Sequence, residues 1–133
     1  MNSGALADRL PIDDQLEAIR GALTPGATVV LQAPPGAGKT TRVPLELLKA
    51  FGDQGRILLI EPRRLATRAA AERLAAGLGE AVGEQVGYSV RLERRSSSLT
   101  RLEVLTGGLF LRRLQADPAL EGVACVIFDL SLI

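Results

Sequence analysis

The sequence contains no histidine and a single cysteine, Cys125. The absence of histidine excludes histidine general bases and histidine metal ligands from the chemistry of these residues. One cysteine cannot close an intrachain disulfide, and it cannot build a zinc site from thiolates. Its neighbours are apolar, which is typical of core packing. Any metal that these residues bind must therefore be a hard, oxygen-preferring ion such as Mg²⁺.

Aromatic residues are scarce as well, and they are limited to Phe51, Tyr88, Phe110 and Phe128. Because 47% of the residues are nevertheless hydrophobic, we expect an aliphatic core. A length of 133 residues is enough for one domain. No apolar run approaches the ~20 residues that span a membrane, and the first residues do not resemble a signal peptide. We therefore expect a cytoplasmic protein without membrane association, whose oligomeric state the sequence leaves open.

Neither sign of charge predominates, because the sequence contains sixteen Lys and Arg residues and fifteen Asp and Glu residues, for a net charge of +1. The total charge therefore does not predict an anionic partner. The arginines are nevertheless clustered, first as Arg63, Arg64, Arg68 and Arg73, and then as Arg91, Arg94, Arg95 and Arg101. Such clusters are common on solvated surfaces, but they also suit contacts with phosphate groups.

Glycine and proline separate short apolar runs from longer helical patterns. These patterns predict helices at residues 13–23, 39–50, 64–78 and 108–115. They predict strands at residues 27–32, 56–61, 86–92, 102–106 and 123–129, and a loop at 94–98. Apolar strands that alternate with helices indicate an α/β fold with a parallel sheet covered on both faces. Ligands are then expected at the carboxyl ends of the strands.

The segment APPGAGKT, which begins at Ala33, lies between the first expected strand and the following helix. It matches G-x-x-x-x-G-K-[S/T] except that Ala33 replaces the first glycine. Gly36 and Gly38 allow successive N–H groups to converge on an anion, and the helix N-terminus adds its positive dipole end. Lys39 can reach the β- and γ-phosphates, and Thr40 can offer its hydroxyl to Mg²⁺. A turn without chemistry is the alternative, but the order of strand, loop, Lys-Thr and helix favours phosphate binding.

A family resemblance rests on the segments APPGAGKTTRVPLELL, EPRRLATRAAAERLA, VGYSVRLE, TGGLFLRRLQADP and VIFD. In this order they resemble the first RecA-like domain of the DEAH/DExH-box ATP-dependent RNA helicases, in particular those of the bacterial HrpB type. The resemblance runs from about Leu10 to Asp129. It implies a P-loop NTPase with a RecA-like, mostly parallel sheet, ATP and Mg²⁺ as cofactors, and RNA or another single-stranded nucleic acid as partner. The implied activity couples ATP hydrolysis to movement on, or unwinding of, nucleic acid.

The same resemblance implies roles for individual residues. The nucleotide-binding residues would be Pro35, Gly36, Ala37, Gly38, Lys39, Thr40 and Thr41, with Arg73 stacking on the base. Contacts with the nucleic-acid backbone would come from Arg63, Arg64, Thr106 and Gly108. The catalytic residues would be Lys39 and Asp129, and Mg²⁺ would be held by Thr40 and Asp129, by the latter through water.

Each of these roles has a simpler alternative. Arg63 and Arg64 suit solvated charges at the start of a helix, and Arg73 suits an ordinary charge on an alanine-rich helix. Thr106 suits a helix N-cap, which is compatible with a phosphate contact at the same helix end. Asp129 follows an apolar run, where a carboxylate is costly unless it meets a cation or hydrogen-bond donors, so its magnesium role is favoured.

The sequence departs from the family at Leu130, where the family has the glutamate of Asp-Glu-x-His that activates the attacking water. The strand of motif III and the second RecA-like domain would follow Ile133. We therefore expect residues 1–133 to be a partial first RecA-like domain that binds nucleotide without turnover. The alternatives are a P-loop NTPase or kinase that does not act on nucleic acid, and a non-catalytic nucleotide- or RNA-binding fragment.

Overall fold

The computed structural model describes residues 11–26, 29 and 39–129. Its helices are the 3-10 helix η1 (Pro11–Gln15) and the α-helices α2 (Leu16–Ala22), α3 (Lys39–Phe51), α4 (Arg64–Gly77) and α5 (Gly107–Ala116). Its strands are β1 (Arg56–Glu61), β2 (Val86–Val90), β3 (Glu93–Arg95), β4 (Leu102–Thr106) and β5 (Val123–Phe128). None of the described helices is long and apolar enough to cross a membrane.

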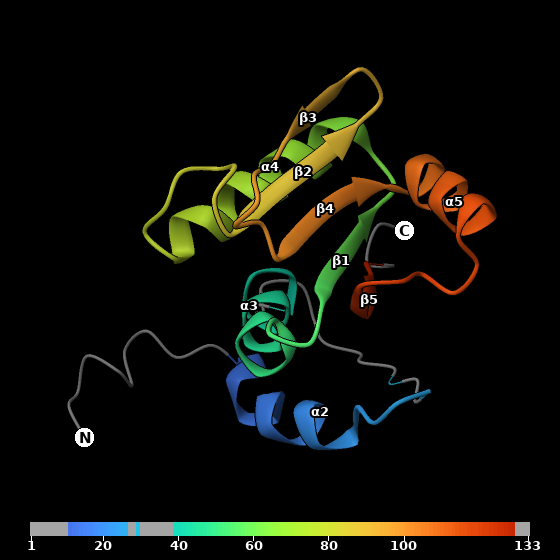
Figure 1. Cartoon of the computed structure of the whole chain (residues 1–133). Helices are drawn as coiled ribbons and strands as arrows, with labels where there is room; N and C mark the ends of the chain where they lie inside the picture. The colour runs from blue at the N-terminus through green and yellow to red at the C-terminus, as the bar shows by residue number, and fades with distance from the viewer. Residues whose placement is uncertain (1–10, 27–28, 30–38, 130–133) are drawn as a thin grey trace.

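The described strands form one sheet in the order β3-β2-β4-β1-β5 (Figure 1). β1 pairs in parallel with β4 on one side and with β5 on the other, and β2 pairs in parallel with β4. β3 is antiparallel to β2. The register places Leu59 of β1 between Val104 of β4 and Ile127 of β5. This confirms the expected mostly parallel sheet, in which the carboxyl ends of β1, β2, β4 and β5 share one edge.

The two faces of the sheet bury different side chains of β1, because side chains alternate along a strand. Ile57 and Leu59 belong to the larger core, which also contains residues of η1, α2, α3 and α4. Leu58 and Ile60 belong to a smaller core with Phe110 of α5. Helices therefore cover both faces, as the sequence predicts, with α3 and α4 on one face and α5 on the other (Figure 1).

The expected loop at residues 94–98 is wrong at its start, because β3 pairs with β2 across a tight turn. Val90 lies opposite Glu93, so the strand that was expected to reach Leu92 ends two residues earlier. Leu92 has a φ of 73°, a left-handed backbone conformation that is rare for leucine. Such hairpin turns usually carry glycine or asparagine at the positions with positive φ. The sequence therefore contains no signal for this turn.

Other expected elements either agree with the structure or fall on residues that the structure does not describe. The helix expected at residues 13–23 begins two residues earlier, as η1, and continues as α2. The helix expected at residues 39–50 is α3, which contains Pro44. Apart from Val29, the strand expected at residues 27–32 lies outside the described residues, as do the phosphate-loop residues 33–38.

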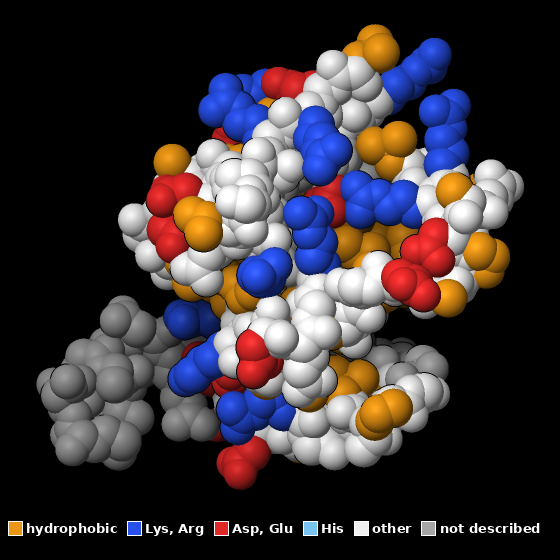
Figure 2. Space-filling view, viewed as in Figure 1, with side chains coloured by type: hydrophobic (Ala, Val, Ile, Leu, Met, Phe, Trp, Pro, Cys, Tyr) orange, Lys and Arg blue, Asp and Glu red, His pale blue; other side chains and the backbone are white. Residues whose placement is uncertain are grey.

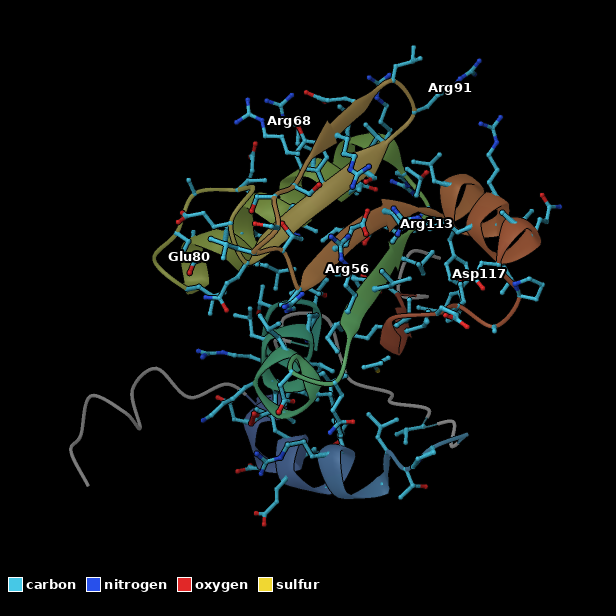
Figure 3. All side chains as sticks on the ribbon, viewed as in Figure 1. Arg56, Arg68, Glu80, Arg91, Arg113 and Asp117 are labelled. Atoms are coloured by element: carbon cyan, nitrogen blue, oxygen red, sulfur yellow. The ribbon has the colours of Figure 1, made fainter. Side chains whose placement is uncertain are left out.

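A buried carboxylate, Glu103 of β4, lies within the sheet and is 0% exposed. It accepts hydrogen bonds from Ser89 Oγ at 2.6 Å, from Arg56 Nη1 at 2.9 Å, and from Arg113 Nη1 and Nη2 at 2.8 and 2.5 Å. Figure 3 shows Arg56 and Arg113 converging over β4, and Figure 2 shows basic side chains gathered over this part of the face. Burial by itself would raise the pKa of Glu103, but the hydrogen bonds from Arg113 and Ser89 and the arginine charges lower it to about 2.

Candidate nucleotide and nucleic-acid site

Two carboxyl groups meet where β1 and β5 end. Ile60 of β1 lies opposite Phe128 of β5, and the backbone N–H of Asp129 donates to the carbonyl oxygen of Ile60 at 3.3 Å. Asp129 therefore continues the pairing by one residue, beside Glu61. Cys125 and Ile127, the alternate residues before Asp129, pack against the core that α3 and α4 cover, as does Leu59 before Glu61. Both acidic side chains accordingly belong to the α3 and α4 face of the sheet.

Glu61 is buried, with 3% of its surface exposed, whereas Asp129 is only partly buried. Burial raises the pKa of Glu61, and the negative charge of Asp129 and a side-chain hydrogen bond with it raise it further. The positive charges of Arg73 and Arg63 act in the opposite direction. The structure therefore brings three of the predicted site residues, Asp129, Arg63 and Arg73, into the electrostatic surroundings of Glu61.

The helix that follows the phosphate-loop motif lies on this same face. α3 contacts both β1 and β5, and its residues Val43 and Leu47 are buried in the larger core. Lys39, Thr40 and Thr41 form the first turn of α3, in which both threonines are partly buried. The predicted loop residues Pro35, Gly36, Ala37 and Gly38 lie outside the described residues.

The kinds of oxygen donor at this edge and at the start of α3 suit Mg²⁺. The described residues contain no group of three His, Cys, Asp or Glu residues that could hold a metal ion by themselves. The carboxyl pair of Glu61 and Asp129, with the hydroxyl of Thr40 in the first turn of α3, is a set of hard oxygen donors. Mg²⁺ usually binds through one or two carboxylates together with substrate phosphates and water. The chain's own residues therefore fit a magnesium ion that arrives with a nucleotide.

Arg63 and Arg64 lie at the start of α4, where β1 has just ended. Arg63 occupies the N-cap position, and its carbonyl oxygen accepts hydrogen bonds from the backbone N–H of Thr67 at 2.9 Å and from Thr67 Oγ1 at 2.7 Å. Both arginine side chains are exposed. The simpler alternative is thus correct about their place at a helix start. Their exposed position at the carboxyl edge of the sheet is also compatible with a phosphate contact.

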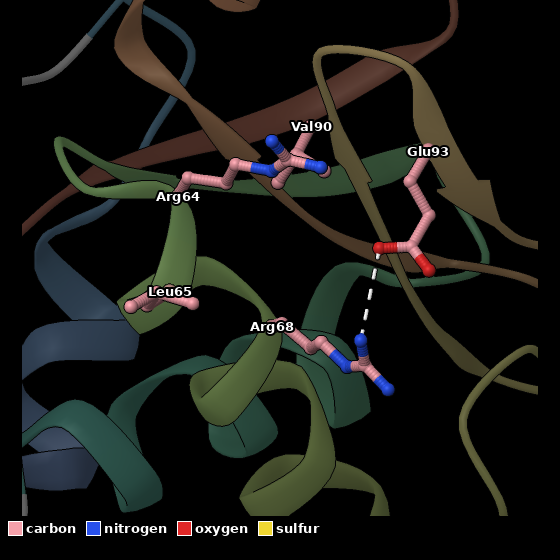
Figure 4. Close-up of a pocket in the computed structure, with 5 residues that line it drawn as sticks. All are labelled: Arg64, Leu65, Arg68, Val90 and Glu93. Atoms are coloured by element: carbon pink, nitrogen blue, oxygen red, sulfur yellow. Dashed lines mark ion pairs between the residues drawn. The ribbon is translucent and has the colours of Figure 1, made fainter.

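A shallow pocket of about 330 Å³ lies beside Arg64, between the start of α4 and the β2–β3 hairpin (Figure 4). Its lining residues are Arg64, Leu65, Arg68, Val90 and Glu93. Arg68 is restrained there, because its guanidinium lies 3.9 Å from Glu93 and 3.3 Å from Glu72. Leu65 is 83% exposed. The pocket is therefore lined by two apolar, two basic and one acidic side chain, and one of the basic residues, Arg64, is itself a predicted backbone-contact residue.

Thr106 is an N-cap, as the simpler alternative proposed, because its Oγ1 accepts a hydrogen bond from the backbone N–H of Leu109 at 3.4 Å. The register pairs Thr106 with Glu61, so the start of α5 lies at the same edge of the sheet. Gly108 is exposed in the first turn, and a side chain added there would contact nothing within 4 Å. Arg73 is farther along α4 and is exposed, in agreement with the simpler alternative.

Glu61, the neighbour of Asp129 at this edge, is not among the residues that the sequence analysis selects. The signal was present, because RILLIE ends in an acid after an apolar run, as VACVIFD does. The sequence alone identifies Glu61 only as the last residue of a strand. Which acids share an edge depends on strand order, and the adjacency of β1 and β5 is a property of the sheet.

Comparison with known proteins shows that this chain is similar to helicases. The sequence profile described as DEAD/DEAH box helicase matches residues 12–129. The chain is 48% identical over 120 residues to the ATP-dependent RNA helicase HrpB of Escherichia coli, covering 90% of the chain and 15% of that protein. It is 37% identical over 129 residues to human ATP-dependent RNA helicase DHX30, covering 92% of the chain and 11% of that protein.

Solved structures agree with these relatives. The crystal structure of the Escherichia coli DEAH/RHA helicase HrpB superposes with a TM-score of 0.85 at 48% identity, over 90% of this chain and 15% of that one. A crystal structure of the E. coli DExH-box NTPase HrpB gives a TM-score of 0.85 at 47% identity, over 92% of this chain. The expected RecA-like fold is thereby confirmed. The chain spans 15% of HrpB and 11% of DHX30. It belongs to the DEAD/DEAH box helicase family.

Proposed function

We propose that this chain is the ATP-binding part of an ATP-dependent RNA helicase, and that it binds nucleotide with Mg²⁺ at the carboxyl edge of its sheet. The observation that carries the proposal is the position of Asp129, which follows β5 in register with β1, on the face where α3 follows the phosphate-loop motif. The relatives named as ATP-dependent RNA helicases support this function over a kinase that does not act on nucleic acid.

The nucleotide would be held mainly through its phosphates. The phosphates would be surrounded by the backbone N–H groups of Gly36, Ala37 and Gly38, which follow Pro35 in the phosphate-loop motif, and by those at the start of α3. Lys39 would add its charge, and Thr40, Thr41 and Asp129 would hold the metal and its water shell. Mg²⁺ would supply positive charge that neutralises the phosphate oxygens.

Nucleic acid would be gripped at its backbone. Arg63 and Arg64 are exposed at the start of α4. At the start of α5, which lies at the same edge of the sheet, Gly108 is exposed and Thr106 is partly buried. Guanidinium groups and helix N-termini bind phosphates without reading bases. The bound strand would therefore be RNA or another single-stranded nucleic acid of any sequence.

Turnover would be absent from this polypeptide. Leu130 stands where the family has the glutamate that deprotonates the attacking water, and a leucine side chain cannot accept a proton. General-base assistance typically contributes about a hundredfold to ten-thousandfold to a rate. In a complete helicase of this family, the coupling of hydrolysis to movement on RNA would require this step.

Equilibrium binding of fluorescent ADP with Mg²⁺ tests the proposal. Lys39→Ala should weaken binding about tenfold or more, because a hydrogen bond to a charged group contributes about 1.5–3 kcal/mol. Lys49→Ala is the matched control, since Lys49 lies exposed in the last turn of the same helix. Equal affinity of the wild type and Lys39→Ala would refute the nucleotide site.

A further inference from the structure

We propose that four arginines, Arg56, Arg94, Arg101 and Arg113, form a second contact surface for the phosphate backbone of nucleic acid. They lie on the face of the sheet that carries α5, and we call this surface the arginine face. The inference rests on the proposed nucleic-acid interface at the carboxyl edge and extends that interface across the sheet.

Glu103 of β4 marks the face on which these arginines lie. Its carboxylate accepts hydrogen bonds from Arg56 of β1 and from Arg113 of α5 (Figure 3). Ser89 of β2 also donates to it, and the register pairs Ser89 with Arg94 of β3. Side chains of directly paired residues lie on the same face of a sheet. β1, β3 and α5 therefore each bring one arginine to the face of Glu103.

Arg101 joins them just before β4. It lies two residues before Glu103, and its carbonyl oxygen accepts a hydrogen bond from the N–H of Ile57 at 2.8 Å, which continues the pairing of β1 with β4. Because side chains alternate along a strand, Arg101 and Glu103 lie on the same face. β2 and β4 separate β3 from β1, so the arginine face extends about 14 Å across the sheet.

All four side chains are accessible from solvent. Arg94 and Arg101 are exposed. The side chains of Arg56 and Arg113 are 28% and 37% exposed, although both bond to Glu103. α5, the described helix on this face, contacts β4 and β1. Figure 2 shows basic side chains at the surface beside it, where a ligand can reach them.

The charge on this face is unbalanced, although that of the whole chain is not. Within the described strands and α5, Glu103 is the one acidic side chain on this face. Glu93 and Glu61 lie on the other face, where Glu93 contacts Arg68 of α4 and Leu59 before Glu61 packs into the larger core. Four positive charges and one negative charge give the arginine face a net charge of +3. Such a surface attracts polyanions.

Glu103 also restrains two of the arginines before any ligand binds. Arg113 donates to it through both Nη atoms, and Arg56 donates through Nη1 at 2.9 Å. A side chain that is already ordered loses less entropy on binding, so the ligand gains more from each contact. The planar guanidinium groups suit phosphate oxygens. The arginine face is therefore partly preorganised for phosphates.

The position of α5 connects the arginine face to the carboxyl edge. Gly108 is a predicted backbone-contact residue in the first turn of α5, and Arg113 follows it by five residues on the same helix, about 7.5 Å along the axis. A nucleic-acid strand that contacts the start of α5 can continue onto the arginine face. This continuity favours nucleic acid over an acidic protein as the occupant.

The test measures how salt affects the binding of fluorescent single-stranded oligouridine to the 133-residue chain, by anisotropy. Arg94→Ala with Arg101→Ala removes two exposed arginines and keeps all hydrogen bonds to Glu103. The slope of log K against log salt should fall by about 1.4, because each phosphate contact with a single strand contributes about 0.7. The loss of affinity should accordingly be about sevenfold greater at ~50 mM than at ~200 mM salt.

Arg95→Ala with Lys49→Ala is the matched control, because it removes the same charge from exposed positions elsewhere. Arg95 follows Arg94 on β3 but pairs with Tyr88, whose side chain lies in the larger core on the α4 face. Lys49 lies in the last turn of α3. This double variant should keep the slope of the wild type.

The outcomes separate this inference from the proposed function. An unchanged slope in Arg94→Ala with Arg101→Ala, or an equal fall in the control, would overturn the arginine face. Arg63→Ala with Arg64→Ala tests the carboxyl edge independently. If only that pair lowers the slope, the interface at the edge stands and the arginine face fails. If the wild type does not bind RNA, both fail.

Chemical protection gives a second readout that needs no substitution. Phenylglyoxal modifies exposed arginines, and mass spectrometry locates the modified residues. Bound oligouridine should protect Arg94 and Arg101 but leave Arg95 reactive. Equal reactivity of Arg94 and Arg101 with and without RNA would contradict the proposal. Protection of both by polyglutamate and not by RNA would assign the surface to an acidic protein instead.

Discussion

Replacing Glu103 with glutamine should destabilise the fold by about 3 kcal/mol at pH 7. The wild-type carboxylate has a pKa of about 2 instead of 4.5, because Arg113, Ser89 and Arg56 overcome the effect of its burial. This lowering of the Glu103 pKa corresponds to about 3 kcal/mol in the free energy of unfolding. Removing one member of a buried ion pair costs a similar amount, about 3–5 kcal/mol, because the partner charges are left uncompensated. The loss is a large part of the ~5–15 kcal/mol that stabilises a typical domain.

The sign of the pH dependence follows from the lowered pKa. Glu103 contributes its stability fully above its unfolded-state pKa of 4.5, and it loses this contribution as the pH falls toward its folded-state pKa of about 2. Glutamine does not titrate. The difference in stability between the wild type and Glu103→Gln should therefore be constant from pH 6 to pH 8 and should shrink between about pH 4.5 and pH 2.

Urea unfolding followed by circular dichroism at a series of pH values measures this difference. Glu72→Gln is a suitable control, because Glu72 pairs with Arg68 on the exposed surface of α4, and surface ion pairs contribute little. A difference below about 1 kcal/mol at pH 7, or one that grows as the pH falls, would refute the assigned role of the Glu103 cluster.

Two further predictions concern activity and nucleic-acid binding. The 133-residue chain should hydrolyse no ATP above background in a phosphate-release assay, with or without RNA, because Leu130 cannot activate water; turnover that disappears in Lys39→Ala would contradict this. Single-stranded RNA should bind weakly and without sequence preference, and Arg63→Ala with Arg64→Ala should reduce the slope of log K against log salt by about 1.4. An unchanged slope, or a strong preference for one RNA sequence, would show that these arginines do not contact phosphates.

The parts of the fold that the sequence predicted are those with local signals. β1 and β4 agree with the predicted ranges because apolar side chains predominate in both, and the start of α3 agrees because it follows the phosphate-loop motif. β3 was missed because Glu-Arg-Arg has no apolar alternation and because its turn uses Leu92 where glycine is usual.

The candidate site was only partly predictable for a related reason. Asp129, Thr106, Arg63 and Arg64 are indicated by motifs, and the structure places them at one edge of the sheet, whereas Arg73 lies farther along α4. Glu61 became recognisable as their neighbour only once β1 and β5 were known to be adjacent. Glu103 is similar, since its partner Arg56 lies 47 residues away in the sequence and no local pattern links the two.

Isothermal titration of ATPγS into the wild type and Asp129→Asn, each with Mg²⁺ and with EDTA, would examine the proposed nucleotide site itself. Asparagine keeps the size of the side chain but removes the charge that would hold the metal. The wild type should bind more tightly with Mg²⁺ than in EDTA, and Asp129→Asn should lose most of this gain while keeping the affinity measured in EDTA. An equal gain from Mg²⁺ in both proteins would contradict the assignment of the carboxyl ends of β1 and β5 as the place where nucleotide and metal bind.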